Sequence, residues 1–242
     1  MSPNRSASDR PASDRSAESR PASDPPRIDY VSPLPPVRSG IADYSADLLP
    51  ELALRADVRL VLLHDQPVDA PWRETFATID SHSWLAEGGD RSRLPVFHMG
   101  NNPYHLEVWR LAMEVPGLLV LHDLMLHHFL LQRTAAVGAV EDYRAQLAAD
   151  HGWVGKAIGD AFEWPGGFGD AARFELPAHR HLLERQRGVV VHNRWAADRL
   201  HEELPALRVE VMRMGLPRPQ AADAEAGVAF RRRHGLPENV PL

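Results

Sequence analysis

Five segments of this 242-residue chain place histidine, asparagine or glycine after a short apolar run, at 39–40, 98–105, 122–128, 192–194 and 214–215. Histidine and asparagine both donate and accept hydrogen bonds near neutral pH, and glycine lets backbone approach a ligand closely. These residue types suit a ligand rich in hydroxyl groups, or an anion. Cysteine is absent, which excludes disulfides and thiolate zinc sites.

His122 follows the apolar run 118–121, and Asp123 could orient its imidazole or cap the next helix. A histidine satisfied by backbone at a sheet edge fits this position equally well. The His-Asp pair, together with His98, His105 and His127, also raises the alternative of an HD-type metal-dependent phosphohydrolase. Such enzymes place the pair within a helix, whereas here it ends an expected strand. We therefore favour hydrogen bonding and expect no metal site.

The segment "HMGNNPYH" offers Asn101 and His105 as residues that could line a cleft. Asn102 followed by Pro103 is typical of a helix N-cap and its first residue, so we expect Asn102 to cap. The ligand role therefore fits Asn101 and His105 better.

The proline-rich corner "SPLPPVRSG" ends in Ser39-Gly40, just before an amphipathic run. Gly40 could let backbone approach a ligand beside a helix N-terminus, which favours anions. Alternatively, it supplies only a turn with positive φ. The pattern is neither G-x-G-x-x-G nor a P-loop.

"HNRW" adds Asn193 and Arg194 at another expected strand end. Arg194 could hold a phosphate or pair with a surface carboxylate. Trp153, Trp164 and Phe168 could form an aromatic wall for a sugar or lipid acceptor, although core packing is the simpler interpretation.

The hydrophobic pattern predicts short buried strands that alternate with helices. Strands are expected at 28–31, 58–64, 77–80, 94–100, 117–123, 188–193 and 208–215, and helices at 42–55, 103–114, 124–133, about 143–162, 177–187 and 194–204. Apolar strands that alternate with helices require a parallel sheet covered on both faces. We predict a doubly wound, Rossmann-like α/β domain over 27–215, whose strand C-terminal ends share one edge.

Composition limits the remaining possibilities. Residues 1–26 repeat Ala-Ser-Asp, are nearly free of large apolar side chains, and are expected to be disordered. The formal net charge is −6, without a Lys/Arg stripe, which argues against nucleic acid. No apolar run reaches the ~20 residues that span a bilayer. An apolar signal-peptide core is also missing, so a cytoplasmic protein is expected, with local peripheral membrane contact left open.

The order of these segments resembles the N-terminal domain of retaining glycosyltransferases of family 4, which have the GT-B fold. "SPLPPVRSGIADYS", "FHMGNNPYH", "PGLLVLHDLMLHH", "GVVVHNRWAADRL" and "VMRMGLP" carry the resemblance, which covers roughly residues 28–217. It implies sugar transfer with retention from a nucleotide-sugar to an acceptor hydroxyl, without a bound metal. By this resemblance, His122 contacts the donor sugar, and Ser39 and Gly40 approach its phosphates. Asn101, His105, Asp123, Asn193 and Arg194 line the cleft.

The chain departs from the family pattern after residue 215. Residues 216–242 resemble a linker and the start of a second domain, but the donor-binding half with its E-x7-E signature is missing. We therefore expect the chain to be an acceptor-binding half with little activity alone, whose partners are that missing domain, a nucleotide-sugar, and a sugar, glycan or lipid-linked acceptor. A non-catalytic Rossmann-like binding module remains the other alternative.

Overall fold

A computed structural model describes residues 24–64, 66–162, 171–215 and 223–237, and all structural statements concern these residues. Most of the expected disordered tail, together with Trp164 and Phe168, lies outside the described residues.

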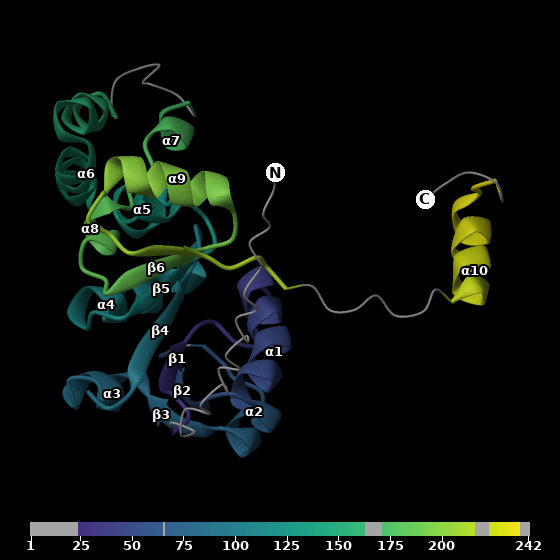
Figure 1. Cartoon of the computed structure of the whole chain (residues 1–242). Helices are drawn as coiled ribbons and strands as arrows, with labels where there is room; N and C mark the ends of the chain where they lie inside the picture. The colour runs from purple at the N-terminus through teal and green to yellow at the C-terminus, as the bar shows by residue number, and fades with distance from the viewer. Residues whose placement is uncertain (1–23, 65, 163–170, 216–222, 238–242) are drawn as a thin grey trace, which may run out of the picture.

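The fold is built on one seven-stranded, all-parallel sheet in the order β3-β2-β1-β4-β5-β6-β7 (Figure 1). This confirms the predicted doubly wound α/β class, because β1 pairs with both β2 and β4 and the chain reverses direction across the sheet there. The strands are β1 (Arg27–Val31), β2 (Asp57–Leu62), β3 (Ala77–Asp80), β4 (Leu94–Met99), β5 (Leu118–Leu121), β6 (Gly188–Val191) and β7 (Val209–Val211).

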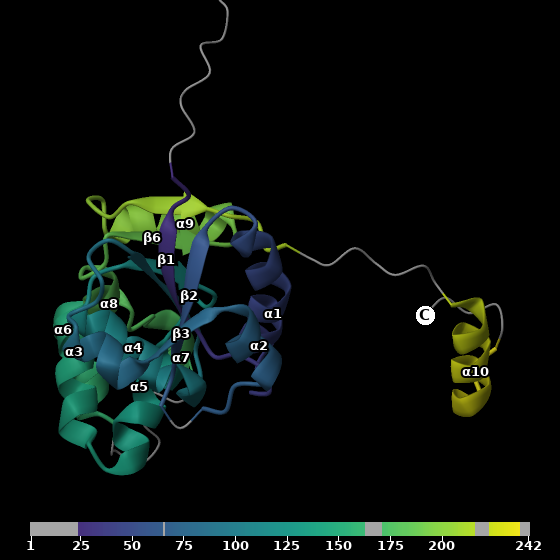
Figure 2. The same ribbon diagram turned by 90° about the horizontal axis from the view of Figure 1, so that it is seen from below.

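Helices cover both faces of the sheet (Figures 1 and 2). On one face α1 and α2 pack over an apolar cluster that includes Tyr30 and Leu60, and on the other α3, α4, α5, α8 and α9 pack over a cluster that includes Phe97 and Leu119. The helical elements are α1 (Gly40–Ala53), α2 (Ala70–Thr75), α3 (Ser81–Ala86), η1 (Pro103–His105), α4 (Leu106–Glu114), α5 (His127–Arg133), η2 (Ala135–Val137), α6 (Val140–Asp160), α7 (Ala171–Glu175), α8 (Arg180–Leu183), α9 (Arg194–Glu203) and α10 (Ala224–His234).

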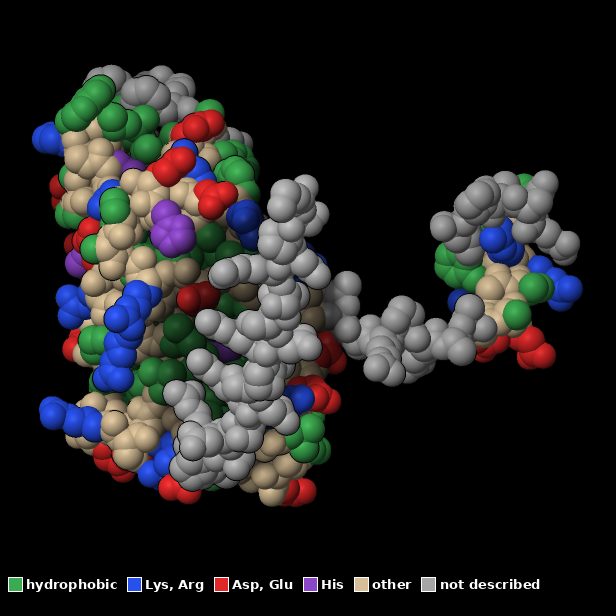
Figure 3. Space-filling model, in the orientation of Figure 1, with side chains coloured by type: hydrophobic (Ala, Val, Ile, Leu, Met, Phe, Trp, Pro, Cys, Tyr) green, Lys and Arg blue, Asp and Glu red, His purple; other side chains and the backbone are tan. Residues whose placement is uncertain are grey.

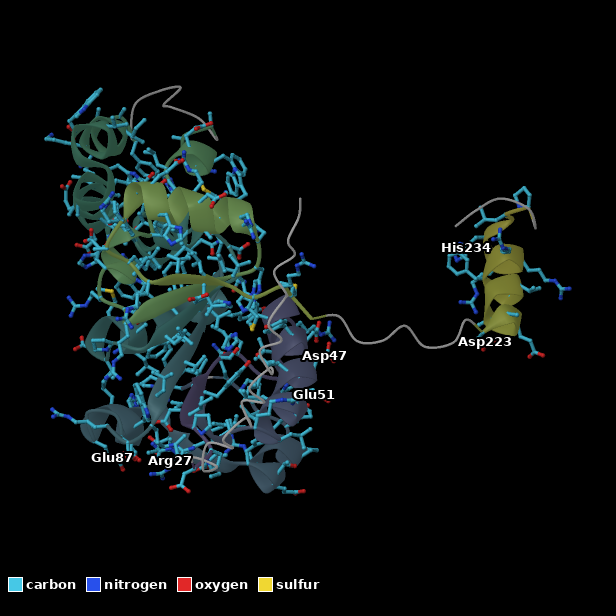
Figure 4. All side chains as sticks on the ribbon, in the orientation of Figure 1. Arg27, Asp47, Glu51, Glu87, Asp223 and His234 are labelled. Atoms are coloured by element: carbon cyan, nitrogen blue, oxygen red, sulfur yellow. The ribbon has the colours of Figure 1, made fainter. Side chains whose placement is uncertain are left out.

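Helix α1 shows how the sequence pattern selects a face. Ile41 and Leu49 are buried against the sheet, whereas Asp47 and Glu51 are exposed on the outer side of the helix (Figure 4). This spacing places apolar side chains on one stripe of the 3.6-residue period.

Several predicted elements have different bounds. Helix α1 begins at Gly40, two residues before the predicted start, and β7 is shorter than predicted because only three residues pair with β6. The helix predicted from 124 begins at His127, since the N–H of Leu126 donates to the carbonyl of Pro177. The helix predicted over 177–187 is reduced to α8, because Ala178 has a left-handed backbone (φ 53°) that a helix does not accept.

A buried carboxylate ties β1, β2, α3 and the residue before β4 together near the amino-terminal ends of the strands. Asp29 is fully buried and accepts hydrogen bonds from Arg59, Arg93 and the indole N–H of Trp84 at 2.7 to 2.9 Å. Arg27, at the same end of the sheet in Figure 4, bonds Asp57 at 3.2 Å. Both Asp29 oxygens are thus satisfied by charge-assisted bonds, which offset the desolvation of the carboxylate.

Acidic and basic side chains are interspersed on the face shown in Figure 3. Within the described residues, no helix combines the length and the apolar character needed to cross a bilayer.

Candidate functional site

The polar segments singled out in the sequence follow β1, β4, β5 and β6, which are neighbours in the parallel sheet. Their carboxyl ends therefore meet at one edge, on both sides of the point between β1 and β4 where the strand order reverses. Two contacts confirm this proximity. The N–H of Asn101 donates to Asp123 Oδ2 at 2.9 Å, and Tyr44 of α1 contacts the rings of His122 and His192.

Three histidines form a hydrogen-bonded row along this edge. His98 Nδ1 lies 3.1 Å from His122 Nε2, and His122 Nδ1 lies 3.2 Å from His192 Nε2. His192 Nδ1 continues the row to the carbonyl oxygen of Met212, which follows β7, at 3.0 Å. Both ring nitrogens of His122 are therefore engaged by neighbouring imidazoles.

The same local pattern produces all three positions. Val-x-His occurs at the ends of β4, β5 and β6, and residues two apart in a strand point to the same face. The preceding valines belong to the apolar cluster beneath α1, so the histidines lie on the α1 side. His98 pairs in register with Val120, which precedes His122 by two residues. His98 therefore lies further from the carboxyl edge of the sheet than His122 does. Its side chain is 1 % exposed, whereas His122 and His192 are partly exposed.

Tyr44 covers the row from α1. Its ring centroid lies 5.9 Å from that of His98, 5.0 Å from His122 and 5.7 Å from His192. Partial burial raises the pKa of the Tyr44 phenol, so it remains a neutral donor and acceptor. A hydrogen bond of 3.0 Å from the Tyr30 hydroxyl to Ser45 Oγ fixes α1 to β1 and so holds Tyr44 in place.

His98 and His122 are uncharged at neutral pH. Burial is the main reason that the pKa of His122 falls to about 3, with a smaller contribution from repulsion by His192. Burial likewise holds the pKa of His98 well below its usual range. A neutral imidazole has one donor and one acceptor nitrogen, so neighbouring neutral imidazoles can hydrogen-bond to one another. Two imidazolium ions cannot, because both ring nitrogens of each only donate.

His105 lies beside the row but is not a member of it. Its side chain is fully buried, neither ring nitrogen has a hydrogen-bond partner among the described residues, and burial lowers its pKa to about 4. Gly100 provides the space for it, because a Cβ at residue 100 would lie 2.8 Å from His105 Nε2 and 2.5 Å from Ile41 Cδ1. His105 is therefore enclosed by protein.

Ser39 and Gly40 form the beginning of α1. Ser39 is the N-cap, and its Oγ accepts the N–H of Ile41 at 3.2 Å. The alternative of a positive-φ turn at Gly40 is wrong, because Gly40 adopts no such backbone angle and is the first residue of the helix. A Cβ at this position would meet no atom within 4 Å. Neither backbone strain nor crowding requires glycine here.

Asn101 and Asp123 make mainly structural contacts. Asn101 Oδ1 accepts the N–H of Phe129 at 2.8 Å, in the first turn of α5. Asp123 neither caps α5 nor bonds the imidazole of His122 in this structure, contrary to both expectations, because its Oδ2 accepts the N–H of Asn101. These bonds join the loops that follow β4 and β5.

The remaining candidates divide between capping and surface positions. Asn102 caps η1, as predicted, through the N–H of Tyr104 at 3.0 Å. Asn193 caps α9 through the N–H of Ala196 at 2.8 Å. Arg194 is exposed and forms no ion pair with a described residue.

Two further expectations concern residues beyond the row. His127 is buried between the carbonyl of Leu176 (2.9 Å) and the hydroxyl of Tyr143 (2.8 Å), so it serves packing. The interpretation of Trp153 as a core residue is wrong, because this residue of α6 is 82 % exposed.

Comparison of the chain with protein-family models, with curated proteins and with solved structures gave no match. The interpretation of the site therefore depends on its own residues. Among the described residues, no group of three or more histidine and acidic side chains is arranged to hold a metal ion.

Four of the cavities in the described part of the chain lie away from the histidine row. One of about 460 Å³ lies beside α3 and α4, and one of about 510 Å³ lies between α6 and α9. Neither is lined by His98, His122 or His192. We place the candidate site at the row because hydrogen-bonding side chains from three strands and α1 converge there, at the edge where open α/β sheets bind ligands.

The sequence prediction placed His98 and His192 at strand ends without assigning them to the site, and it missed Tyr44. The repeated Val-x-His pattern was a usable signal for the two histidines, because equal spacing after a buried valine fixes the face. Nothing in the pattern around Tyr44 distinguishes it from the other half-buried residues of α1.

Proposed function

We propose that the chain supplies the acceptor-side domain of a retaining glycosyltransferase of the GT-B type. The supporting observation is the convergence of Ser39-Gly40, Asn101, His122 and Asn193 at one edge of a parallel sheet. The family resemblance requires this arrangement.

The amino-terminal end of α1 suits the phosphates of a nucleotide-sugar donor. A 14-residue helix carries a partial positive charge at its first turn, where backbone N–H groups lack helical partners. Gly40 leaves open space at that turn, so a phosphate or the transferred sugar can approach the backbone.

His122 is proposed to bond an oxygen of the transferred sugar. Both of its nitrogens are already bonded, so a ligand must replace one neighbouring imidazole. His192 is the exchangeable partner, since it is partly exposed and lies at the edge, whereas His98 is buried.

Retaining transfer develops positive charge at the anomeric carbon and negative charge on the leaving diphosphate. His122 is neutral, so it orients the sugar without repelling the carbon centre. The basic groups for the diphosphate are expected in the second domain.

The test is a transfer assay on a protein in which this chain continues into a second Rossmann-like domain. A panel of nucleotide-sugars is incubated with sugar and lipid-linked acceptors, and products are detected by mass spectrometry. We expect transfer with retained anomeric configuration, and little or none from the 242-residue chain alone. Absence of transfer with every donor in the two-domain protein would favour a binding module instead.

A further inference from the structure

The hydrogen bonds of the histidine row can be ordered in only one satisfactory way. A neutral imidazole has one N–H donor and one bare nitrogen that accepts. Each of the two nitrogen–nitrogen contacts, at 3.1 and 3.2 Å, therefore needs a donor on one side and an acceptor on the other. Choosing the donor at one contact fixes the donor at the next.

The carbonyl of Met212 determines which nitrogen donates at each contact. A carbonyl oxygen only accepts, so the proton of His192 must be on Nδ1, which faces it at 3.0 Å. His192 Nε2 then accepts from His122 Nδ1–H, and His122 Nε2 accepts from His98 Nδ1–H. The row ends at His98 Nε2, which is bare, buried and without a partner among the described residues.

The opposite order is worse at both ends. It would place the bare nitrogen of His192 against the carbonyl oxygen of Met212, and it would bury an unpaired N–H on His98. An added proton on the row has a similar consequence, because His192 would then donate at both nitrogens and the unpaired N–H would again fall on buried His98. A buried donor without a partner is costly, so the row keeps the first order.

We infer that His98, His122 and His192 act as one unit in which every member carries its proton on Nδ1. His98 and His192 are thereby positioning residues for His122, and they make its Nδ1–H a donor to any ligand that displaces His192. Resting on the proposed function, this selects a ligand oxygen that accepts a hydrogen bond there, such as the oxygen of a sugar hydroxyl.

The tautomers can be measured directly on the 242-residue chain. Long-range ¹H–¹⁵N spectra of uniformly ¹⁵N-labelled protein at pH 7 distinguish protonated from bare ring nitrogens. We expect protonated Nδ1 and bare Nε2 for all three histidines, although isolated histidine in water favours a proton on Nε2. A proton on Nε2 of His122, or averaged shifts that indicate a mixture, would overturn the inference.

Matched substitutions test the positioning roles. An asparagine amide can replace the Nδ1 donor of His98, and a glutamine carbonyl can replace the Nε2 acceptor of His192, whereas leucine replaces neither. His98→Asn and His192→Gln should therefore keep His122 protonated on Nδ1. The double variant His98→Leu/His192→Leu should release it to a mixture of tautomers, because neither neighbour then orders its proton. Unchanged His122 shifts in that double variant would refute the positioning roles.

His127 provides an internal control for folding. Its Nδ1 faces the Leu176 carbonyl and its Nε2 faces the Tyr143 hydroxyl, so its tautomer is also fixed, but by groups outside the row. A variant that retains the His127 signature is folded, and its His122 shifts then report on the row alone. None of these measurements needs a sugar or a second domain, so their failure and the failure of sugar transfer are distinguishable.

Discussion

Two glycines at the candidate site should respond in opposite ways to the same substitution. A Cβ added at Gly40 meets no atom within 4 Å, whereas one added at Gly100 lies 2.5 Å from Ile41 Cδ1 and 2.8 Å from His105 Nε2. Gly40→Ala should therefore leave the free energy of unfolding unchanged or raise it by up to about 1 kcal/mol, because alanine favours the helix.

Gly100→Ala should lower the free energy of unfolding by about 1–3 kcal/mol, the usual range for overpacking. For a chain of this size that corresponds to a decrease in Tm of roughly 2–12 °C. The end of the Ile41 side chain can move in part, but the His105 ring is fully buried, so the clash is not relieved by rotation alone.

A second substitution isolates the contact responsible. Ile41→Val removes Cδ1, the atom nearest to the added methyl group, at a cost of about 0.5–1.5 kcal/mol by itself. The double variant Gly100→Ala/Ile41→Val should then be more stable than the sum of the single effects predicts, by about 1 kcal/mol. Thermal and urea unfolding measure all four proteins.

The outcome that would refute this reasoning is a destabilised Gly40→Ala or an unaffected Gly100→Ala. In the two-domain protein, Gly40→Ala should also weaken sugar transfer without lowering the free energy of unfolding. The fold does not need glycine at this position, so a loss of transfer would reflect the contact between Gly40 and the ligand. Full activity of that variant would remove Gly40 from the proposed donor site.

Three further predictions concern stability. Asp29→Ala should lower the free energy of urea unfolding by about 3–5 kcal/mol, because buried Arg93 and partly buried Arg59 each lose a charged hydrogen-bond partner, and a near-neutral effect would contradict the network. His105→Leu should flatten the loss of stability between pH 6.5 and about 4. In this pH range His105 binds a proton in the unfolded chain but not in the folded one, so the free energy of unfolding falls by up to about 1.4 kcal/mol per pH unit as the pH decreases. An unchanged slope in the variant would assign that loss of stability to other groups. Asn101→Ala should cost about 1 kcal/mol by removing the acceptor for the N–H of Phe129; unchanged thermal unfolding would contradict it.

The sheet was predictable from sequence because its central strands β1, β4, β5 and β6 are buried almost throughout and form apolar runs. Helices α2 and α3 were not, since each has six residues and a helical period is not visible over so short a length. The left-handed backbone at Ala178, which shortened a predicted helix, likewise has no local sequence signal.

The candidate site was predictable only in part. The carboxyl ends of parallel strands lie at one edge of the sheet, so the sequence could place His122, Asn101 and Asn193 at the same edge. The structure has this arrangement. The bond from Phe129 to Asn101 joins residues 28 apart in sequence, and local patterns contain no information about such pairs. The same holds for Tyr44, whose contacts with three strand ends depend on where α1 packs.

The most direct test of the proposed sugar transfer compares two histidine variants of the two-domain protein in the same assay. His122→Ala should reduce kcat by about 10²-fold, as expected when one oriented donor at a reacting centre is lost. His201→Ala, at an exposed position near the end of α9, should leave kcat unchanged. Equal activity of the two variants, with both proteins folded, would contradict the role of His122 in sugar transfer.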